Sequence, residues 1–151
     1  MCCVLCRSLV LPFPAHDVGT YPLANGQTYP EDMPVEEAGN MLIGAAAVCL
    51  FEDSPAYARE HWDVMTIWAD YLSQFGLDPE NQLCTDDFAG HLAHNANLSV
   101  KAILGIASYA RMADMLGEKE ASEKYMALAL SLADEWEKMA DDGDHYRLTF
   151  D

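Results

Sequence analysis

Positive charge is scarce in this sequence, in which 8 Lys and Arg stand against 25 Asp and Glu among 151 residues, for a formal net charge of −17. Nucleic acids and anionic membranes attract proteins through Lys and Arg, so this balance argues against both classes of partner. Long apolar runs are missing too, because none reaches the roughly 20 residues of a membrane span. Hydrophobic residues still make up 51% of the chain, which excludes a disordered acidic tail. The composition favours a soluble, helix-rich globule.

Metal-ligand spacings are also missing. Three of the five cysteines crowd the start of the chain, and Cys3 and Cys6 form one C-x-x-C motif. A zinc site needs a second ligand pair, and no Cys/His pair follows at suitable spacing. We therefore predict no metal, no cofactor and no disulfide framework. Residues 1–11 are too short for a signal peptide and form an atypical N-terminal segment before a domain over residues 12–151.

Strand-like alternation is absent as well, and apolar periodicity predicts helices instead. Pro34 and the pair Ser54 and Pro55 are typical of helix starts, and Gly76 and Gly117 of helix ends. The four predicted helices cover residues 35–51, 54–75, 88–116 and 119–140. The apolar arcs of these helices are wide, which indicates helices covered on more than one side. The fold class is therefore all-α.

The lengths of the links predict how these helices are arranged. Residues 52–54 and 117–118 are short links, which join helices into antiparallel hairpins. Three segments are long and polar, namely residues 12–33, 76–87 and 141–151. In an antiparallel array the three long segments lie at one end and the short turns at the other. We expect function at the loop-rich end, because loops on a rigid scaffold commonly carry it.

Chemistry-bearing residues gather in these long segments and in the first turns after them. Carboxylates and imidazoles in a cleft supply general acid–base catalysis. The spacing of Asp87, His91, His94 and Asn95 predicts that one helix face carries all four side chains. The other candidates are His16, Asp17, Asn25, Glu36, Glu37, Asp86, Asp144 and His145.

Structural interpretations of the same residues stay open. Glu36 and Glu37 fit the positive end of a helix dipole, and Asp87 fits an N-cap. His91 and His94 could bind a metal with Asp87, but a third convincing ligand is missing, and hydrogen-bonded structural histidines are the favoured explanation. The acidic residues 141–144 fit a solvated helix end.

Four strings of the sequence resemble one known family. They are HDVGTYPLANGQ (residues 16–27), DMPVEEAGNMLI (residues 32–43), GLDPENQLCTDDFAGHLAHNANLSVKAI (residues 76–103) and DGDHYRLTFD (residues 142–151). Together they resemble the six-helical-hairpin domain of the glutaminase A family, over about residues 12–151. The resemblance implies an α/α toroid and an activity that hydrolyses L-glutamine to L-glutamate and ammonia. It also implies a parent protein that is secreted or held in the cell envelope.

Amide hydrolysis needs an activated water or nucleophile and an acid for the departing ammonia. Under this hypothesis Asp86 and Asp87 activate water, and Glu36 or Glu37 donates the proton. Cys84 and Thr85 are weaker candidates for a nucleophile. The substrate-positioning residues would be His16, Asp17, Asn25, His91, His94, Asn95, Asp144 and His145.

Two other functions are compatible with the sequence. A glycosidase-like toroid would use two carboxylates roughly 6.5–9.5 Å apart, with Tyr21, Tyr29 and Phe88 stacking on sugar rings. A non-catalytic helical-repeat module would explain the hairpin over residues 108–136 but not the polar motifs. An assay of glutamine beside a panel of glycosides distinguishes the glutaminase hypothesis from the glycosidase hypothesis.

The resemblance also predicts that the chain is part of a larger domain, because four helices make two hairpins of six. We therefore expect a partial toroid that is inactive alone. Its partners would be a small-molecule substrate and the remaining hairpins. Uncovered apolar flanks would favour self-association.

Overall fold

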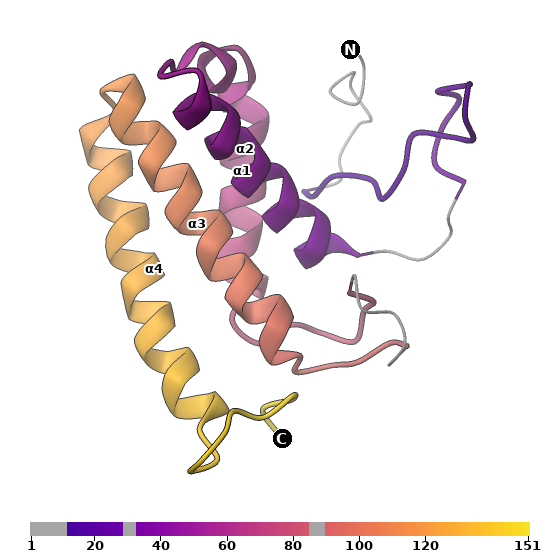
Figure 1. Cartoon of the computed structure of the whole chain (residues 1–151), viewed down its shortest axis with the longest axis vertical. Helices are drawn as coiled ribbons and strands as arrows, with labels where there is room; N and C mark the ends of the chain where they lie inside the picture. Colours follow the sequence, from indigo (N-terminus) through magenta and orange to yellow (C-terminus); the bar gives the residue numbers. More distant parts are fainter. Residues whose placement is uncertain (1–11, 29–32, 85–89) are drawn as a thin grey trace.

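The computed structural model describes residues 12–28, 33–84 and 90–151 and contains four helices. Helix α1 covers Pro34–Phe51, α2 covers Ala56–Phe75, α3 covers Ala96–Leu116 and α4 covers Lys119–Ala140. The described residues contain isolated β-bridges but no strand. The all-α prediction of two antiparallel hairpins is therefore confirmed (Figure 1).

Helix boundaries follow local chemistry. Proline occupies the first turn of α1, where its missing N–H leaves no bond unmade. Gly117 ends α3 in a left-handed conformation, with φ of 84°, that favours glycine. Helix α2 has Pro55 as its N-cap, one residue after the predicted Ser54, and bends at His61, whose φ and ψ are not helical.

The predicted start of the third helix at residue 88 is wrong. Helix α3 begins at Ala96, and its N-cap is Asn95 rather than Asp87. Gly90 and His94 have φ values of 69° and 58°, so the backbone before Asn95 leaves the helical region. Consequently His91, His94 and Asn95 do not share a helix face, and that prediction is wrong as well. Asp87 lies outside the described residues.

Helix α3 lies at the centre of the fold and packs against the other three helices. Glycine allows α1 and α3 to approach closely: a Cβ added to Gly105 would lie 3.2 Å from the Cα of Gly39. The core between the helices contains Leu42, Leu72 and Ile106, all fully buried. Helix α1 is long and apolar enough, by length and composition alone, to cross a membrane, as the core helices of many folded proteins are.

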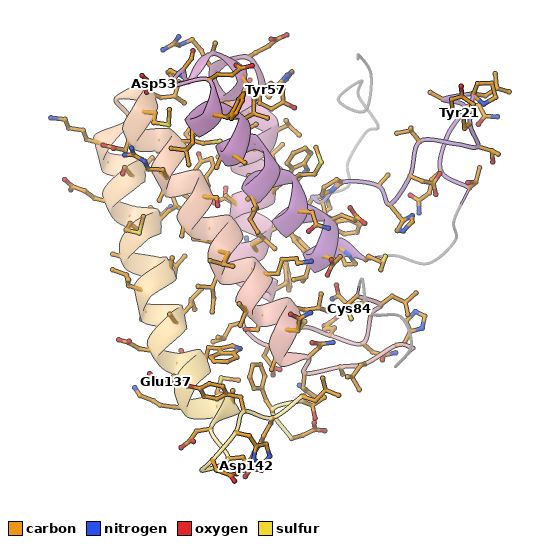
Figure 2. The ribbon with its side chains drawn as sticks, viewed as in Figure 1. Tyr21, Asp53, Tyr57, Cys84, Glu137 and Asp142 are labelled. Atoms are coloured by element: carbon orange, nitrogen blue, oxygen red, sulfur yellow. The ribbon has the colours of Figure 1, made fainter. Side chains whose placement is uncertain are left out.

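The two ends of the helical array differ, as the link lengths predict. The short turns after α1 and α3 lie at the top of Figure 1, and we call this the short-turn end. Residues 76–84, 90–95 and 141–151 lie at the opposite end, where α1 and α3 begin, and we call this the loop end. Residues 12–28 instead extend beside α1, and Figure 2 shows Tyr21 projecting far from the helices. The N-terminal segment therefore does not gather wholly at the loop end.

Candidate functional site

The link between α2 and α3 is anchored beneath the start of α1. The side-chain carbonyl of Gln82 accepts a hydrogen bond of 3.0 Å from the backbone N–H of Val35, one of the donors that a helix N-terminus leaves unpaired. The backbone oxygen of Gln82 accepts from the N–H of Leu92, at 3.1 Å, so the outgoing and returning arms of the link are joined. Gln82 is 5% exposed. The link is thus fixed against the helix that carries Glu36 and Glu37.

Glu36 forms a buried ion pair that ties α1 to α3. Its side chain is 1% exposed, and its Oε1 accepts hydrogen bonds from the ammonium of Lys101 and, at 3.3 Å, from Asn40 Nδ2. A buried carboxylate with a cation as its hydrogen-bond partner escapes much of the cost of lost hydration. The helix-dipole interpretation of Glu36 is thus incomplete, because Lys101 supplies a direct counter-charge.

Glu37 has a different environment from its neighbour. It is only partly buried, and burial raises the pKa of its carboxyl group above the ordinary value. The charge of Glu36 raises the pKa further, whereas His16 and Lys101 oppose the increase. A carboxyl group that keeps its proton to a higher pH and remains accessible is suited to act as a general acid. Because His16 lowers the pKa of Glu37, these two residues are close enough to interact, as residues of one site must be.

Asp17 organises the N-terminal segment. Its Oδ1 accepts hydrogen bonds from the N–H of Gly19 at 2.9 Å and from the N–H of Thr28 at 2.8 Å, which closes the loop between them. His16 Nδ1 lies 3.6 Å from Asp17 Oδ2. Asn25, predicted to bind substrate, is exposed on this loop. Asp17 thus holds this loop closed and at the same time lies beside His16.

Asn95 caps helix α3. Its side-chain oxygen accepts hydrogen bonds from the N–H groups of Asn97 and Leu98, at 2.9 and 3.2 Å, and its Nδ2 lies 3.6 Å from Cys84 Sγ. Asn95 is 2% exposed. Both the oxygen and the nitrogen of its carboxamide therefore have hydrogen-bond partners. They explain the residue as a cap that holds the link against α3.

His94 is paired with Asp78 in the link. The ring Nδ1 lies 2.7 Å from Asp78 Oδ1, and this hydrogen bond, with the charge of Asp78, raises the pKa of His94 above its ordinary value. The N–H of Phe150 donates to the carbonyl of His94, at 3.0 Å, so the C-terminal segment packs against this part of the link. His91 is exposed. The two histidines thus have separate environments.

Asp144 and His145 belong to an exposed cluster in the C-terminal segment. His145 Nδ1 lies 2.7 Å from Asp144 Oδ1, and Arg147 contacts Asp142 at 3.0 Å. Two open hollows of about 420 and 600 Å³ lie here, both lined by Tyr146, and neither is lined by Glu36 or Glu37. Figure 2 shows Asp142 at the extreme of the loop end, apart from Cys84. The predicted residues therefore fall into separate groups rather than one.

Asp86 and Asp87, the predicted water-activating residues, lie outside the described residues, as do Thr85, Tyr29 and Phe88 and the N-terminal cysteines. Cys84, which precedes the two aspartates, is buried beside Asn95. Across residues 12–28, 33–84 and 90–151, no group of three His, Cys, Asp or Glu side chains is arranged to hold a metal ion.

Sequence reasoning missed Lys101 and Gln82. The sequence does contain a signal for Lys101, which lies within the apolar string VKAIL of an acidic chain. A lysine at such a position is uncommon and indicates a carboxylate partner. Gln82 carried no such signal, since an amide in a polar link has many uses.

Comparison with known proteins places this site in context. The sequence model of the glutaminase A six helical-hairpin domain matches residues 8–151. Glutaminase A of Aspergillus oryzae is 35% identical over 127 residues, which cover 82% of this chain and 18% of that protein. A protein of Arthroderma benhamiae named as a probable glutaminase is 37% identical over 86 residues, 56% of this chain and 10% of that protein. The chain thus spans less than a fifth of the length of either relative.

Proposed function

This chain belongs to the glutaminase A six helical-hairpin domain family, and from that membership we propose that it supplies an acid–base site for hydrolysis of the carboxamide of L-glutamine. The observation that carries the proposal is the pair of adjacent carboxyl groups at the start of α1. Glu36 is buried on Lys101, whereas Glu37 is partly exposed with a raised pKa. Two carboxyl groups whose surroundings separate their protonation states are typical of acid–base sites.

The proposed reaction assigns the acid to Glu37 rather than Glu36. Water attacks the side-chain carbonyl carbon of glutamine, and a carboxylate takes one proton from that water. Glu37 donates its proton to the amide nitrogen, the C–N bond breaks, and ammonia departs to leave glutamate. Glu36 is too deeply buried to touch a substrate, so it acts on Glu37 through charge.

Asp86 and Asp87 remain our proposed water-activating residues. Their support is the anchoring of the residues before them: Gln82 is bonded to the start of α1, and Cys84 lies beside the cap of α3. His16 is the substrate-positioning candidate with the best support, because its charge acts on Glu37. We keep the following residues as outer substrate contacts: Asp17, Asn25, His91, His94, Asn95, Asp144 and His145.

Further hairpins of the family domain are proposed to complete the site. The family description names six hairpins, and the described residues form two. Large apolar side chains are exposed on all four helices, among them Phe51, Ile67, Leu104 and Leu130. Such a surface is suited to cover by other helices. Self-association of the purified chain through it stays a prediction, which sedimentation velocity tests.

A chimaera tests the proposed function. The 127 residues that align with Aspergillus oryzae glutaminase A would replace their counterparts in that protein, and release of ammonia from L-glutamine would be measured. We expect the folded chimaera to be active, and Glu37→Gln to lower kcat about 10²-fold or more, because a carboxamide cannot donate the proton. Glu80→Gln is the matched control, since it removes an exposed carboxylate from the link.

Two outcomes would contradict the proposal. One is a folded chimaera that releases no ammonia from glutamine but cleaves a glycoside in a parallel panel, which would favour the glycosidase alternative. The other is a Glu37→Gln chimaera with the kcat of the unsubstituted one, which would remove the assigned acid.

A further inference from the structure

Lys101 reaches the carboxyl pair across the interface of α1 and α3. Its ammonium contacts Glu36 Oε1, and its side chain is 22% exposed while that of Glu36 is 1% exposed. A Cβ added to Gly39 would lie 2.6 Å from Lys101 Cγ and 3.2 Å from its backbone oxygen. Glycine at position 39 therefore leaves the space that the lysine stem occupies on its way to Glu36.

The two neighbouring carboxyl groups differ in access, and Glu36 has the ammonium of Lys101 as a direct partner. The charge of Glu36 raises the pKa of Glu37, so a negative charge on one carboxyl group disfavours a negative charge on the other. A cation bound to one carboxylate favours the charged form of that group. The position of Lys101 therefore influences which glutamate carries the proton.

We propose that Lys101 is a positioning residue of the site: by holding Glu36 as the anion, it leaves the proton of the pair on Glu37, the carboxyl group that a substrate can reach. The chemical role of the pair rests on the proposed function, whereas the order of protonation does not. Without the lysine, the more deeply buried Glu36 would be the better place for a proton, because burial disfavours its charge. The accessible group would then be the ionised one.

The other charged groups that act on Glu37 do not reproduce this arrangement. In the described part of the chain the groups with the largest effects are Glu36 on the same helix, Lys101 on α3 and His16 in the N-terminal segment. His16 lowers the pKa of Glu37, as Lys101 does directly, so neither favours the protonated form by its own field. The contact of Lys101 with Glu36 instead favours the charged form of Glu36.

A titration of the 151-residue chain itself tests the order of protonation. Glutamate labelled with ¹³C at the carboxyl carbon would be followed by NMR across pH, with Glu36→Gln and Glu37→Gln to assign the two signals. In the unsubstituted chain we expect Glu37 to release its proton at higher pH than the exposed glutamates, with Glu36 ionised throughout that range. In Lys101→Met we expect the order to invert, with the Glu36 transition moved upward by about one pH unit or more.

Two further variants make the result decisive. Lys101→Arg keeps the positive charge and is expected to keep the original order. Lys101→Gln removes the charge but can still donate a hydrogen bond to Glu36, so it serves if Lys101→Met does not fold. A Glu36 carboxylate that stays ionised in every uncharged variant would overturn the proposal, as would an inversion in Lys101→Arg.

Kinetics of the chimaera separate this inference from the proposed function. Lys101→Met is expected to lower kcat on glutamine about tenfold or more at neutral pH and to move the alkaline limb of kcat to lower pH, and Lys101→Arg to restore the limb. If the chimaera is active and Lys101→Met leaves its pH profile unchanged, that result would contradict the positioning role of Lys101 but not the proposed function. A folded, inactive chimaera would contradict the proposed function, while the NMR titration would still decide the order of protonation.

Discussion

At the short-turn end the molecule buries hydroxyl groups among aromatic rings, whereas at the loop end it buries a carboxylate and two carboxamides and partly buries a lysine. The ring of Tyr109 stacks on Trp62 at 4.4 Å and meets Tyr125 edge-on at 4.7 Å. Thr66 hydrogen bonds to Tyr109, at 2.7 Å, and Asp70 accepts from Tyr125. Burial raises the pKa of both tyrosines, so their hydroxyl groups stay neutral at ordinary pH.

The polar groups of the loop end belong to different elements and include charges. Glu36 on α1 meets Lys101 on α3, Gln82 from the link meets α1, and Asn95 caps α3 beside Cys84. Each contact fixes a loop or a helix start, and the ion pair leaves Glu37 partly exposed beside it. The short-turn end therefore stabilises the fold through aromatic packing, whereas the loop end holds buried polar groups and a charge in paired contacts.

The largest expected effect is at the short-turn end. Tyr109→Ala should lower the free energy of unfolding by about 3–5 kcal/mol, because it removes a fully buried aromatic ring that two other rings contact. Tyr109→Phe keeps the ring and loses one hydrogen bond, so it should cost only about 1 kcal/mol. Urea denaturation followed by circular dichroism measures both. Equal losses would mean that the hydrogen bond, rather than the ring, stabilises this end.

The next effect separates close helix packing from helix propensity within α1. Gly39→Ala places a Cβ against Lys101 and should destabilise the protein by about 1–3 kcal/mol through overpacking. Gly44→Ala, on the same helix, meets nothing within 4 Å and should stabilise it by about 0.5–1 kcal/mol. Melting temperatures of the two variants give the signs. Two stabilised variants would show that α1 moves away from α3 without cost.

Much of the fold was predictable because its determinants are local. The span of α4 and the end of α3 at Gly117 follow from periodicity and cap residues, and the short links predicted the hairpins. The start of α3 was not predictable in this way. His94 takes its positive φ where its N–H bonds to the carbonyl of Pro79, at 2.8 Å, and Ala96 donates to Leu148. Those partners are distant in sequence, so the periodicity of the segment itself could not predict these hydrogen bonds.

The residue types of the candidate site were predictable from the sequence, but the contacts between those residues were not. The sequence predicts Glu36 or Glu37 as the proton donor and does not separate the two. Their different environments depend on how α1 packs against α3, which places Glu36 in contact with Lys101. Gly39 lies against Lys101 at this interface, and such a contact is a property of two packed surfaces rather than of one segment.

A smaller effect tests how the loop end holds the start of α3. Asn95→Ala should lower the free energy of unfolding by about 1 kcal/mol, within a range of roughly 0.5–2 kcal/mol, because two backbone donors lose their cap. Asn97→Ala alters an exposed side chain two residues later and should change stability by less than about 0.5 kcal/mol. Chemical denaturation compares them. Equal effects would assign the loss to helix propensity rather than to capping.

The smallest effect concerns the exposed pair of His94 and Asp78. Because the folded protein raises the pKa of His94 above 6.5, the pair stabilises the fold below that pH and its contribution is lost as pH rises through the folded value. The difference in melting temperature between the unsubstituted chain and Asp78→Asn should therefore be positive near about pH 6 and shrink toward about pH 9. Glu80→Gln removes an exposed carboxylate of the same link and should show no such trend. A difference that grows with pH would mean that the carboxylate of Asp78 stabilises the link through a partner other than the imidazolium.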